Sequence, residues 1–430
     1  MIRRMLAIAA IFVALYISWL FLAQTIKQRT GAMSGKLEGQ VAALWGDRQE
    51  QASPDVQFLW TKIVKDSETV EDPETKKRSF ITKEREVVVE EPQILDASRI
   101  VVDLSLDQRK KGLLWYSTYG VAFTGDYVYT HDDAKDGTAV ITYRFPTTQA
   151  IYDNFRFEVA GVMDPSIVPV DDGGSKVVRA KVPVKAGSTI PFRIAYTSRG
   201  LETWKYSFGD KVNRVKNFDL TMRTRFREID FPEGTISPTS RTETSDGYEL
   251  AWKSENLISG YAIGMVMPQR INPGPLAADM TYFAPVSLFF FFVWMFMITL
   301  MKRIDLHPMN YLFLGAAFFA FHLLFAYSVD HIEIVPAFVA SSLVSVFLVV
   351  SYLRLAVGLR FAAVEAGLSQ LVYLVLFSYA HFFQGFTGLI VTIGSILTLF
   401  ALMQLTGRIR WSQMEAAWGK ESSAQQLDAR

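Results

Sequence analysis

The chain has 430 residues, half of them hydrophobic and 13% aromatic, and a formal net charge of +1. A charge so close to zero gives no bulk attraction to nucleic acid. The absence of cysteine excludes disulfides, thiolate catalysis and cysteine-ligated zinc. The apolar residues concentrate at the N-terminus and after Tyr282, and the polar stretch between them has an ordinary globular composition. This pattern indicates a membrane protein that carries one large domain outside the lipid.

The first predicted element is a membrane span at Leu6–Thr25, which follows Arg3 and Arg4. Its apolar run is longer than the hydrophobic region of a cleaved signal peptide, and no clear cleavage site follows it, so we expect an uncleaved signal anchor. Residues 34–51, SGKLEGQVAALWGDRQEQ, have helical spacing of apolar groups and predict a short amphipathic helix. Residues 64–80 are charged and predict an exposed loop.

The rest of the polar stretch alternates between apolar and polar residues, which is typical of half-buried strands. Turn-forming sequences such as VDDGGS and FPEGT separate about ten such runs, and the short spacing favours a β-sandwich or a pair of packed sheets. The predicted runs begin near Ile100, Trp115, Ala139, Phe155, Val178, Ile190, Trp204, Phe218 and Tyr248.

Five further spans are predicted at Tyr282–Met301, Asn310–Val329, Val335–Tyr352, Phe361–His381 and Phe386–Thr406. The basic residues of the short loops all fall on one side if both termini are cytoplasmic, as the positive-inside rule requires. The expected fold is therefore a six-span α-helical membrane protein with a large, mainly-β extracytoplasmic domain resembling a β-sandwich. Its expected parts are a cytoplasmic tip and anchor span (1–25), a periplasmic domain with a short N-terminal helix (26–281), a five-helix bundle (282–411) and a cytoplasmic tail (412–430).

Several stretches resemble the inner-membrane CreD family. They are VAALWGDRQEQASP (41–54), RKKGLLWYSTYGVAFTGDY (109–127), LHPMNYLFLGAAFFAFHLLFAYSVDHI (306–332) and LTGRIRW (405–411). The resemblance covers nearly the whole chain, but residues 220–245 depart from the family's usual Gly-Ser turn and Pro-Ser-Phe stretch. It implies a bacterial inner-membrane protein linked to envelope integrity and to stress on the cell wall or membrane. It identifies no catalytic residues.

Three polar residues in the predicted spans are candidates for an intramembrane function: His322, Glu365 and Gln370. An ionisable residue inside a span usually faces the bundle and has a partner. For His322 the structural alternative is an interhelical hydrogen bond. For Glu365 it is snorkelling to the surface or pairing with Arg360 or Arg354. For these three residues the sequence leaves two alternatives open: a purely structural role, and a role in a proton or ion relay.

Outside the spans, Arg223, Arg225 and Arg227 alternate and would share one strand face, opposite Met222 and Phe226. Arginine suits carboxylate or phosphate, so this face is a candidate site for an anionic envelope or cell-wall component, against the alternative of a solvated face. A second set at the outer surface, Asp330, His331, Glu333 and His381, has zinc-compatible ligand types but no metal-site spacing, so polar loop ends are the default interpretation. Asp305 or His307 is expected to cap the helix that begins near Pro308.

No enzyme motif is present, and the outer domain contains one histidine, His131. We therefore expect a non-enzymatic protein without a cofactor or metal, whose partners are the lipid bilayer, an anionic or cell-wall component of the envelope, and other membrane proteins, but not nucleic acid. It would support envelope integrity or a stress response through a periplasmic binding or sensing domain. The alternative is a transporter or channel for a small solute, lipid or protons.

Overall fold

The computed structural model describes residues 2–71, 78–112, 114–163, 167–209, 213–383 and 385–407. The predicted tail, 412–430, lies outside the described residues. The chain divides into two compact units, each considered by itself. The membrane unit contains the chain up to Lys36 and from Ile271 onward, with Gly112–Leu114; the β unit contains Leu37–Lys111 and Trp115–Arg270.

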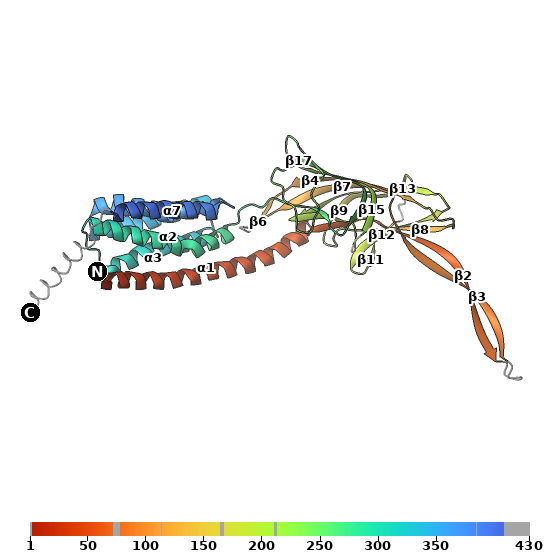
Figure 1. Ribbon diagram of the computed structural model, residues 1–430, viewed down its shortest axis with the longest axis horizontal. Helices are drawn as coiled ribbons and strands as arrows, with labels where there is room; N and C mark the ends of the chain where they lie inside the picture. Colours follow the sequence, from red (N-terminus) through yellow and green to blue (C-terminus); the bar gives the residue numbers. More distant parts are fainter. Residues whose placement is uncertain are drawn as a thin grey trace, which may run out of the picture. The chain divides into compact units, whose positions relative to one another are not determined.

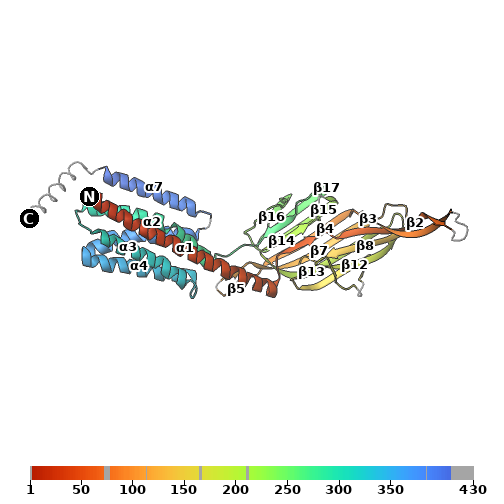
Figure 2. The ribbon, with the colours of Figure 1, turned by 90° about the horizontal axis from the view of Figure 1, so that it is seen from below.

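Among the described residues, six helical segments are long and apolar enough to cross a bilayer, which confirms that the six predicted spans are helices. Five of them are α1 (Ile2–Trp45), α2 (Pro273–Met301), α3 (Pro308–Ser328), α4 (Ile334–Ala356) and α7 (Thr387–Thr406). The remaining span, Phe361–Phe382, is built from η1 (Phe361–Ala366), α5 (Gly367–Gln370), η2 (Leu371–Leu376), α6 (Phe377–Tyr379) and η3 (Ala380–Phe382). Figures 1 and 2 show the helices of this unit running alongside one another.

Two expected helix boundaries are wrong. The anchor span and the short amphipathic helix are one continuous helix, α1, because Gly31, Gly35 and Gly39 are accommodated inside it. The second span begins at Pro273 rather than Tyr282, since Pro273 and Pro275 occupy the first turn, where a missing N–H costs nothing. The two compact units divide at Lys36/Leu37 and Arg270/Ile271.

The membrane unit packs through aromatic rings and close helix approaches. Trp19 of α1 is fully buried, and its ring lies 5.2 Å from that of Phe319 on α3. A Cβ built on Gly315 of α3 would lie 2.2 Å from a methyl carbon of Leu15. Glycine at that position therefore allows α1 and α3 to approach closely, as small residues do in membrane interfaces. In contrast, most side chains of α7 are exposed, and Figure 2 shows this helix at one edge of the group.

The described part of the β unit contains four sheets. The largest has eight strands in the order β10-β9-β13-β7-β4-β15-β17-β16: Val162–Met163, Tyr152–Val159, Thr189–Leu201, Thr118–Thr130, Ala97–Leu106, Asn213–Thr224, Tyr248–Ser259 and Ser240–Glu243. The five-stranded sheet has the order β11-β12-β8-β2-β3: Val170–Asp172, Ser175–Val184, Gly137–Arg144, Asp55–Glu71 and Arg78–Gln93. The three-stranded sheet is β1-β14-β18: Gln49–Ala52, Thr203–Ser207 and Ile263–Val266. The last pair is β5 (Arg109–Lys111) and β6 (Leu114–Tyr116).

One apolar core joins the three larger sheets. It contains Phe58 and Tyr143 from the five-stranded sheet, Ile194 from the eight-stranded sheet, and Trp204 and Met265 from the three-stranded sheet. All five side chains are fully buried. A core of this kind holds the unit together without disulfides.

Each strand run named from the sequence begins in an observed strand, but the expected loop is wrong where it is described: residues 64–71 and 78–80 are strands, and residues 72–77 lie outside the described residues. Strand β2 continues to Glu71 and β3 begins at Arg78, and the two pair in register along their length. The hairpin projects from the rest of the unit (Figure 1). The sequence of residues 64–80 is charged and shows no apolar alternation, so it carried no signal of a half-buried strand.

Candidate functional site

The first candidate site is the segment Trp45–Gln51, called here the junction segment, where α1 ends and the β unit begins its first strand. Gly46 terminates α1 with φ +106°, and its N–H donates to the carbonyl of Ala42 at 2.9 Å. A Cβ at Gly46 would lie 2.1 Å from the carbonyl oxygen of Arg199. Glycine is therefore required both for the positive φ and for the close approach.

The charged side chains of the junction segment bind the β unit. The Trp45 ring lies 4.2 Å from Cζ of Arg109 and 5.5 Å from Cζ of Arg199, both within cation–π range. Arg48 forms ion pairs with Glu202 and, at 2.8 Å, with Glu38 on α1. Burial lowers the pKa of Arg48, but the two carboxylates outweigh it and raise the pKa overall. Arg48 thus links the last turns of α1 to the loop before β14.

The two glutamines of the junction segment are buried. Gln49 donates to the Ser198 hydroxyl at 2.9 Å and to the Arg199 carbonyl at 2.8 Å. Gln51 accepts from the hydroxyls of Tyr143 at 2.6 Å and Tyr196 at 3.0 Å. Burial raises the pKa of both phenols far above the usual value, so both remain donors.

The amide nitrogen of Gln51 donates to the carbonyls of Ala52 and Arg144 at 2.7 and 3.3 Å. Gln51 therefore makes the four hydrogen bonds that a glutamine amide can make, at a position with 0% exposure. A buried polar group satisfied in this way fixes one arrangement of its neighbours. The family-like sequence WGDRQEQ is thus explained by its contacts.

The segment by which the chain leaves the β unit is also held. The carbonyl of Pro268 accepts from the Ser117 hydroxyl at 2.6 Å and from the Gln108 amide at 2.8 Å. Two residues later, Cζ of Arg270 lies 4.2 Å from the centre of the Trp115 ring. Both the entry and the exit of the β unit are therefore tied to its strands.

The predicted arginine face exists, although the strand β15 ends at Thr224, so Arg225 and Arg227 lie just beyond it. All three arginines are exposed, and Met222 and Phe226 are buried. Arg223 donates to Glu249 at 2.9 Å, a hydrogen bond that raises its pKa. Arg227 donates to the Ser245 carbonyl at 3.2 Å and lies 3.8 Å from Glu243. Two of the three arginines are therefore already engaged within the unit.

The same sheet face carries a row of alternating charge. Facing residues on six neighbouring strands are, in order, Lys253, Asp219, Arg99, Asp126, Arg193 and Glu158. Arg193 binds Asp126 at 2.5 Å, and Lys253 lies 3.4 Å from Asp219. Opposite charges at facing positions each contribute about 0.2–1 kcal/mol. The positive and negative side chains of this row therefore balance one another across the sheet face.

His322 is buried in the membrane unit, but its hydrogen bond is not interhelical as expected. Its Nδ1 donates to the carbonyl of Phe318 on the same helix at 3.0 Å, because that acceptor lies one turn before it. Nε2 has no hydrogen-bond partner among the described residues. The ring packs against Trp19, with centroids 5.8 Å apart.

Gln370 belongs to a separate polar cluster between helices. It donates to the Ser345 hydroxyl on α4 at 2.8 Å, and Ser345 donates to the Ala317 carbonyl on α3 at 2.6 Å. In the described part of the chain, the Gln370 carbonyl oxygen and the nearby Ser341 hydroxyl have no partner. This cluster therefore joins the fifth span, α4 and α3.

Glu365 pairs with Lys302, which follows α2, and not with Arg360 or Arg354 as expected. No hydrogen bond given by the described residues connects Glu365, Gln370 and His322 to one another. Glu365 and Gln370 do share an irregular helix, since π-helical turns occupy 361–366 and 371–376. Such turns are rare and are frequent at functional sites.

The other candidate residues have structural roles. His131 is buried, with Nδ1 3.0 Å from the Tyr129 hydroxyl and Nε2 2.8 Å from the Lys135 carbonyl. His307 caps α3 as expected by accepting from the N–H of Met309 at 3.2 Å. Within the described residues, no three histidine or acidic side chains are grouped to hold a metal ion, so Asp330, His331, Glu333 and His381 do not form one site.

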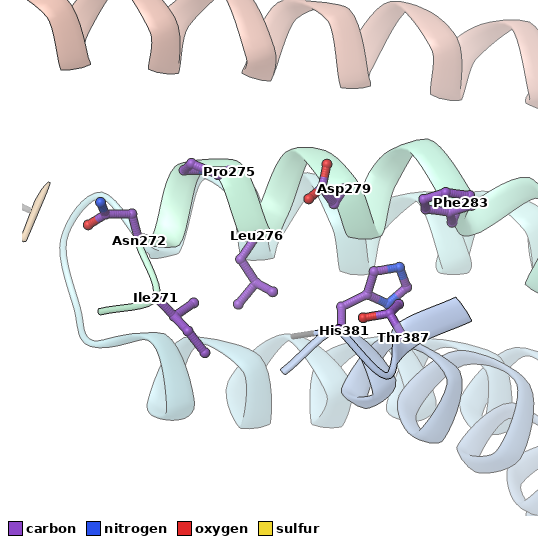
Figure 3. Close-up of a pocket in the computed structure, with 9 residues that line it drawn as sticks. Ile271, Asn272, Pro275, Leu276, Asp279, Phe283, His381 and Thr387 are labelled. Atoms are coloured by element: carbon purple, nitrogen blue, oxygen red, sulfur yellow. The ribbon is translucent and has the colours of Figure 1, made fainter. Parts of the chain in front are cut away.

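A hollow of about 350 Å³ lies in the membrane unit between the start of α2 and the turn before α7 (Figure 3). Asp279 and Phe283 line it from α2, and His381 and Thr387 face them. Sequence reasoning missed Asp279 because it assigned residues up to 281 to the outer domain. A longer helix read back to Pro273 would have placed this carboxylate inside a span.

The model of the inner membrane protein CreD family matches residues 1–412. The chain therefore belongs to the CreD family of inner-membrane proteins. No curated protein matches it.

Solved structures are similar only to part of the chain. One is a protein from Legionella pneumophila subsp. pneumophila str. Philadelphia 1 described as nutrient-binding, with 9% identity over 46% of this chain and 73% of that one, and a TM-score of 0.31. Another is an M1 zinc metallopeptidase from Deinococcus radiodurans, with 10% identity over 41% and 42% of the two chains and a TM-score of 0.24. Leukotriene A4 hydrolase from Saccharomyces cerevisiae has 12% identity over 41% and 30%, with a TM-score of 0.22. These likenesses are too low to carry a functional argument.

Proposed function

We propose that this protein supports the integrity of the bacterial cell envelope without catalysing a reaction. In this proposal its β-rich, sandwich-like domain lies in the periplasm and binds an envelope component. The junction segment then passes the state of that domain to α1. The contacts of Trp45, Arg48 and Gln51 are the observation that carries the proposal.

The threading through the membrane rests on the distribution of charge. Arg3, Arg4, Lys302, Arg303, Arg354 and Arg360 belong to the first residues or to loops that the positive-inside rule assigns to the cytoplasm. The loop 329–333 contains neither lysine nor arginine. Arg4 pairs with Asp305 at 3.0 Å, and Arg29 pairs with Asp330 at 2.8 Å. The α1 residues of these pairs are about 38 Å apart along the helix, which exceeds the thickness of the hydrocarbon core.

The junction segment is suited to transmit a conformational change from the β unit to α1, because several independent contacts fix its position. A flexible linker would let the β unit move without consequence for α1. Here the helix end is capped by Gly46, clamped through Arg48 and continued directly into β1 by two buried glutamines. A rearrangement of the strands around Gln51 would therefore require α1 or its end to respond.

A second candidate, a transporter or channel, is favoured by the unpartnered polar atoms of His322, Gln370 and Ser341 and by the π-helical turns of the fifth span. Intramembrane polar groups of this kind often mark a pathway. Against it, Glu365 is paired with Lys302 and is not linked to the other polar groups by a hydrogen bond. The envelope-binding role therefore ranks first.

The test is complementation in a host from which the gene is deleted, challenged with a cell-wall antibiotic and with a detergent. We expect sensitivity in the deletion strain and full rescue by the wild type. Rescue by His322→Ala with Glu365→Gln, at equal expression, supports the envelope role over transport. Failure of that variant alone would favour transport, and a deletion strain as resistant as its parent would contradict the envelope role.

A further inference from the structure

Two hollows of the membrane unit meet at Asp279. The first is the hollow of about 350 Å³ between α2 and His381. The second, of about 750 Å³, lies between α1 and α2 and shares Asp279 and Phe283 with the first. In Figure 3 the Asp279 carboxylate is directed toward α1, along the upper edge of the view. Both volumes are typical of small-molecule sites.

The second hollow has an apolar part and a charged part. Ile17, Leu20 and Phe21 of α1 form its apolar wall, and Lys27 lies about two turns further along the same helix. The part of α2 that follows Asp279 is 22 residues long and ends at Met301. A helix of this length is enough to span the hydrocarbon core of a bilayer. Asp279 and Lys27 therefore lie at the level of the lipid head groups, and the apolar wall lies at the level of the chains.

The two charges in this hollow are not paired. Lys27 and Asp279 line the same space, yet they form no ion pair with each other or with any other described residue. Neighbouring Arg29, in contrast, is paired with Asp330. Lys27 and Asp279 are both exposed in this open groove, and a cation and an anion set apart there complement a zwitterion whose anion lies at Lys27 and whose cation lies at Asp279.

His381 adds a buried polar group to the first hollow. Its side chain is 5% exposed and lines the first hollow, and neither ring nitrogen has a hydrogen-bond partner among the described residues. Leaving such a group unpaired in a buried site costs free energy. Asp279 and His381 line the same hollow, so a cation within it would meet a carboxylate and an imidazole.

We propose that the two hollows bind one phospholipid with a primary ammonium head group. The ammonium lies between Asp279 and His381, the phosphate lies at Lys27, and an acyl chain lies along Ile17, Leu20 and Phe21. A primary ammonium has three N–H donors, and a quaternary ammonium has none, so the site discriminates between the two head groups. An anionic lipid lacks the cation that Asp279 requires.

The experiment uses the full chain, purified in detergent and stripped of lipid, with native mass spectrometry as the measurement. It is titrated separately with dioleoyl phosphatidylethanolamine, phosphatidylcholine and phosphatidylglycerol. One phosphatidylethanolamine is expected to bind at least about tenfold more tightly than the other two, as a charge-assisted hydrogen bond would give. Equal binding of phosphatidylcholine would overturn the proposal without any variant being made.

Three variants locate the site. Asp279→Asn should remove the preference for phosphatidylethanolamine, and Lys27→Gln should weaken binding of all three lipids. Glu333→Gln is the matched control, because Glu333 is exposed in the loop that carries Asp330, which pairs with Arg29. Unchanged preference in Asp279→Asn, or an equal loss in Glu333→Gln, would show annular lipid only and overturn the proposal. Each variant is accepted only with a wild-type melting temperature.

Discussion

Arg109 holds the Trp45 ring at the end of α1: its Cζ lies 4.2 Å from the ring centroid, and Arg199 approaches the same ring at 5.5 Å. Each contact is worth about 0.5–2 kcal/mol, depending on how much water is excluded. The tryptophan therefore does not merely end an amphipathic helix. It joins that helix to two strands of the β unit, β5 and β13.

Replacing Gln51 with leucine should destabilise the β unit by about 3 kcal/mol or more. The change leaves the hydroxyls of Tyr143 and Tyr196 and the carbonyl of Arg144 without their partner. Thermal unfolding of the full-length protein, followed by near-ultraviolet circular dichroism, measures the loss. Glu50→Ala changes the exposed neighbour on the same strand and should shift stability by less than about 0.5 kcal/mol. Equal effects of the two changes would contradict the hydrogen-bond account.

Gly46→Ala should be severely destabilising, whereas Gly39→Ala should be neutral or stabilising by up to about 1 kcal/mol. At Gly46 the added Cβ meets the Arg199 carbonyl and a positive φ. At Gly39 nothing lies within 4 Å and the backbone is helical. Melting temperatures of the two variants provide the comparison. A Gly46→Ala protein as stable as the wild type would show that α1 does not end as described.

Asp96 should make the β unit sensitive to acid. Burial raises the pKa of this carboxyl, but hydrogen bonds from Lys216 and the N–H of Thr130 outweigh burial and lower it overall. The stabilisation is therefore complete above the ordinary aspartate pKa of about 3.9 and is lost as the pH falls through the lowered value. Asp96→Asn should lower the melting temperature at pH 7 and show less further loss between pH 5 and pH 3 than the wild type. Parallel pH profiles would refute this role.

The threading can be tested by labelling, because the chain has no native cysteine. His307 and His331 are both exposed and lie at opposite ends of α3. An impermeant maleimide applied to intact spheroplasts should label a cysteine at 331 and not one at 307. Detergent lysis should expose both, which controls for reactivity. The reverse pattern would invert the proposed topology.

The elements that bury a periodic apolar face could be predicted from the sequence. Strands such as β4 and β13, and the apolar parts of all six spans, give clear periods of two or long apolar runs. The hairpin β2–β3 could not be predicted, because its outer half is held by backbone pairing between charged strands. The parallel pairing of β1 with β14 also leaves no local signal, since it depends on segments about 150 residues apart.

The candidate sites could be predicted from the sequence only where all the residues of a site lie in one short segment of the chain. Alternation placed Arg223, Arg225 and Arg227 on one face, but not the carboxylates of Glu249 and Asp103 that come from other strands. Composition marked His322 and Glu365 as intramembrane, but not the pairing of Glu365 with Lys302, which follows another helix, α2, and lies 63 residues away along the chain. Distant contacts of this kind are not encoded by local spacing.

The most direct test of the account is rescue of the deletion strain by a variant with a weakened junction segment. Trp45→Leu with Arg48→Gln removes both cation–π contacts and both ion pairs while keeping the buried glutamines. Lys181→Ser is the control, since it removes an exposed cation of β12, away from both the junction segment and the arginine face. The account predicts that the junction variant is expressed and folded, yet fails to restore resistance to the antibiotic and detergent, while the control restores it. Full rescue by the junction variant would contradict it.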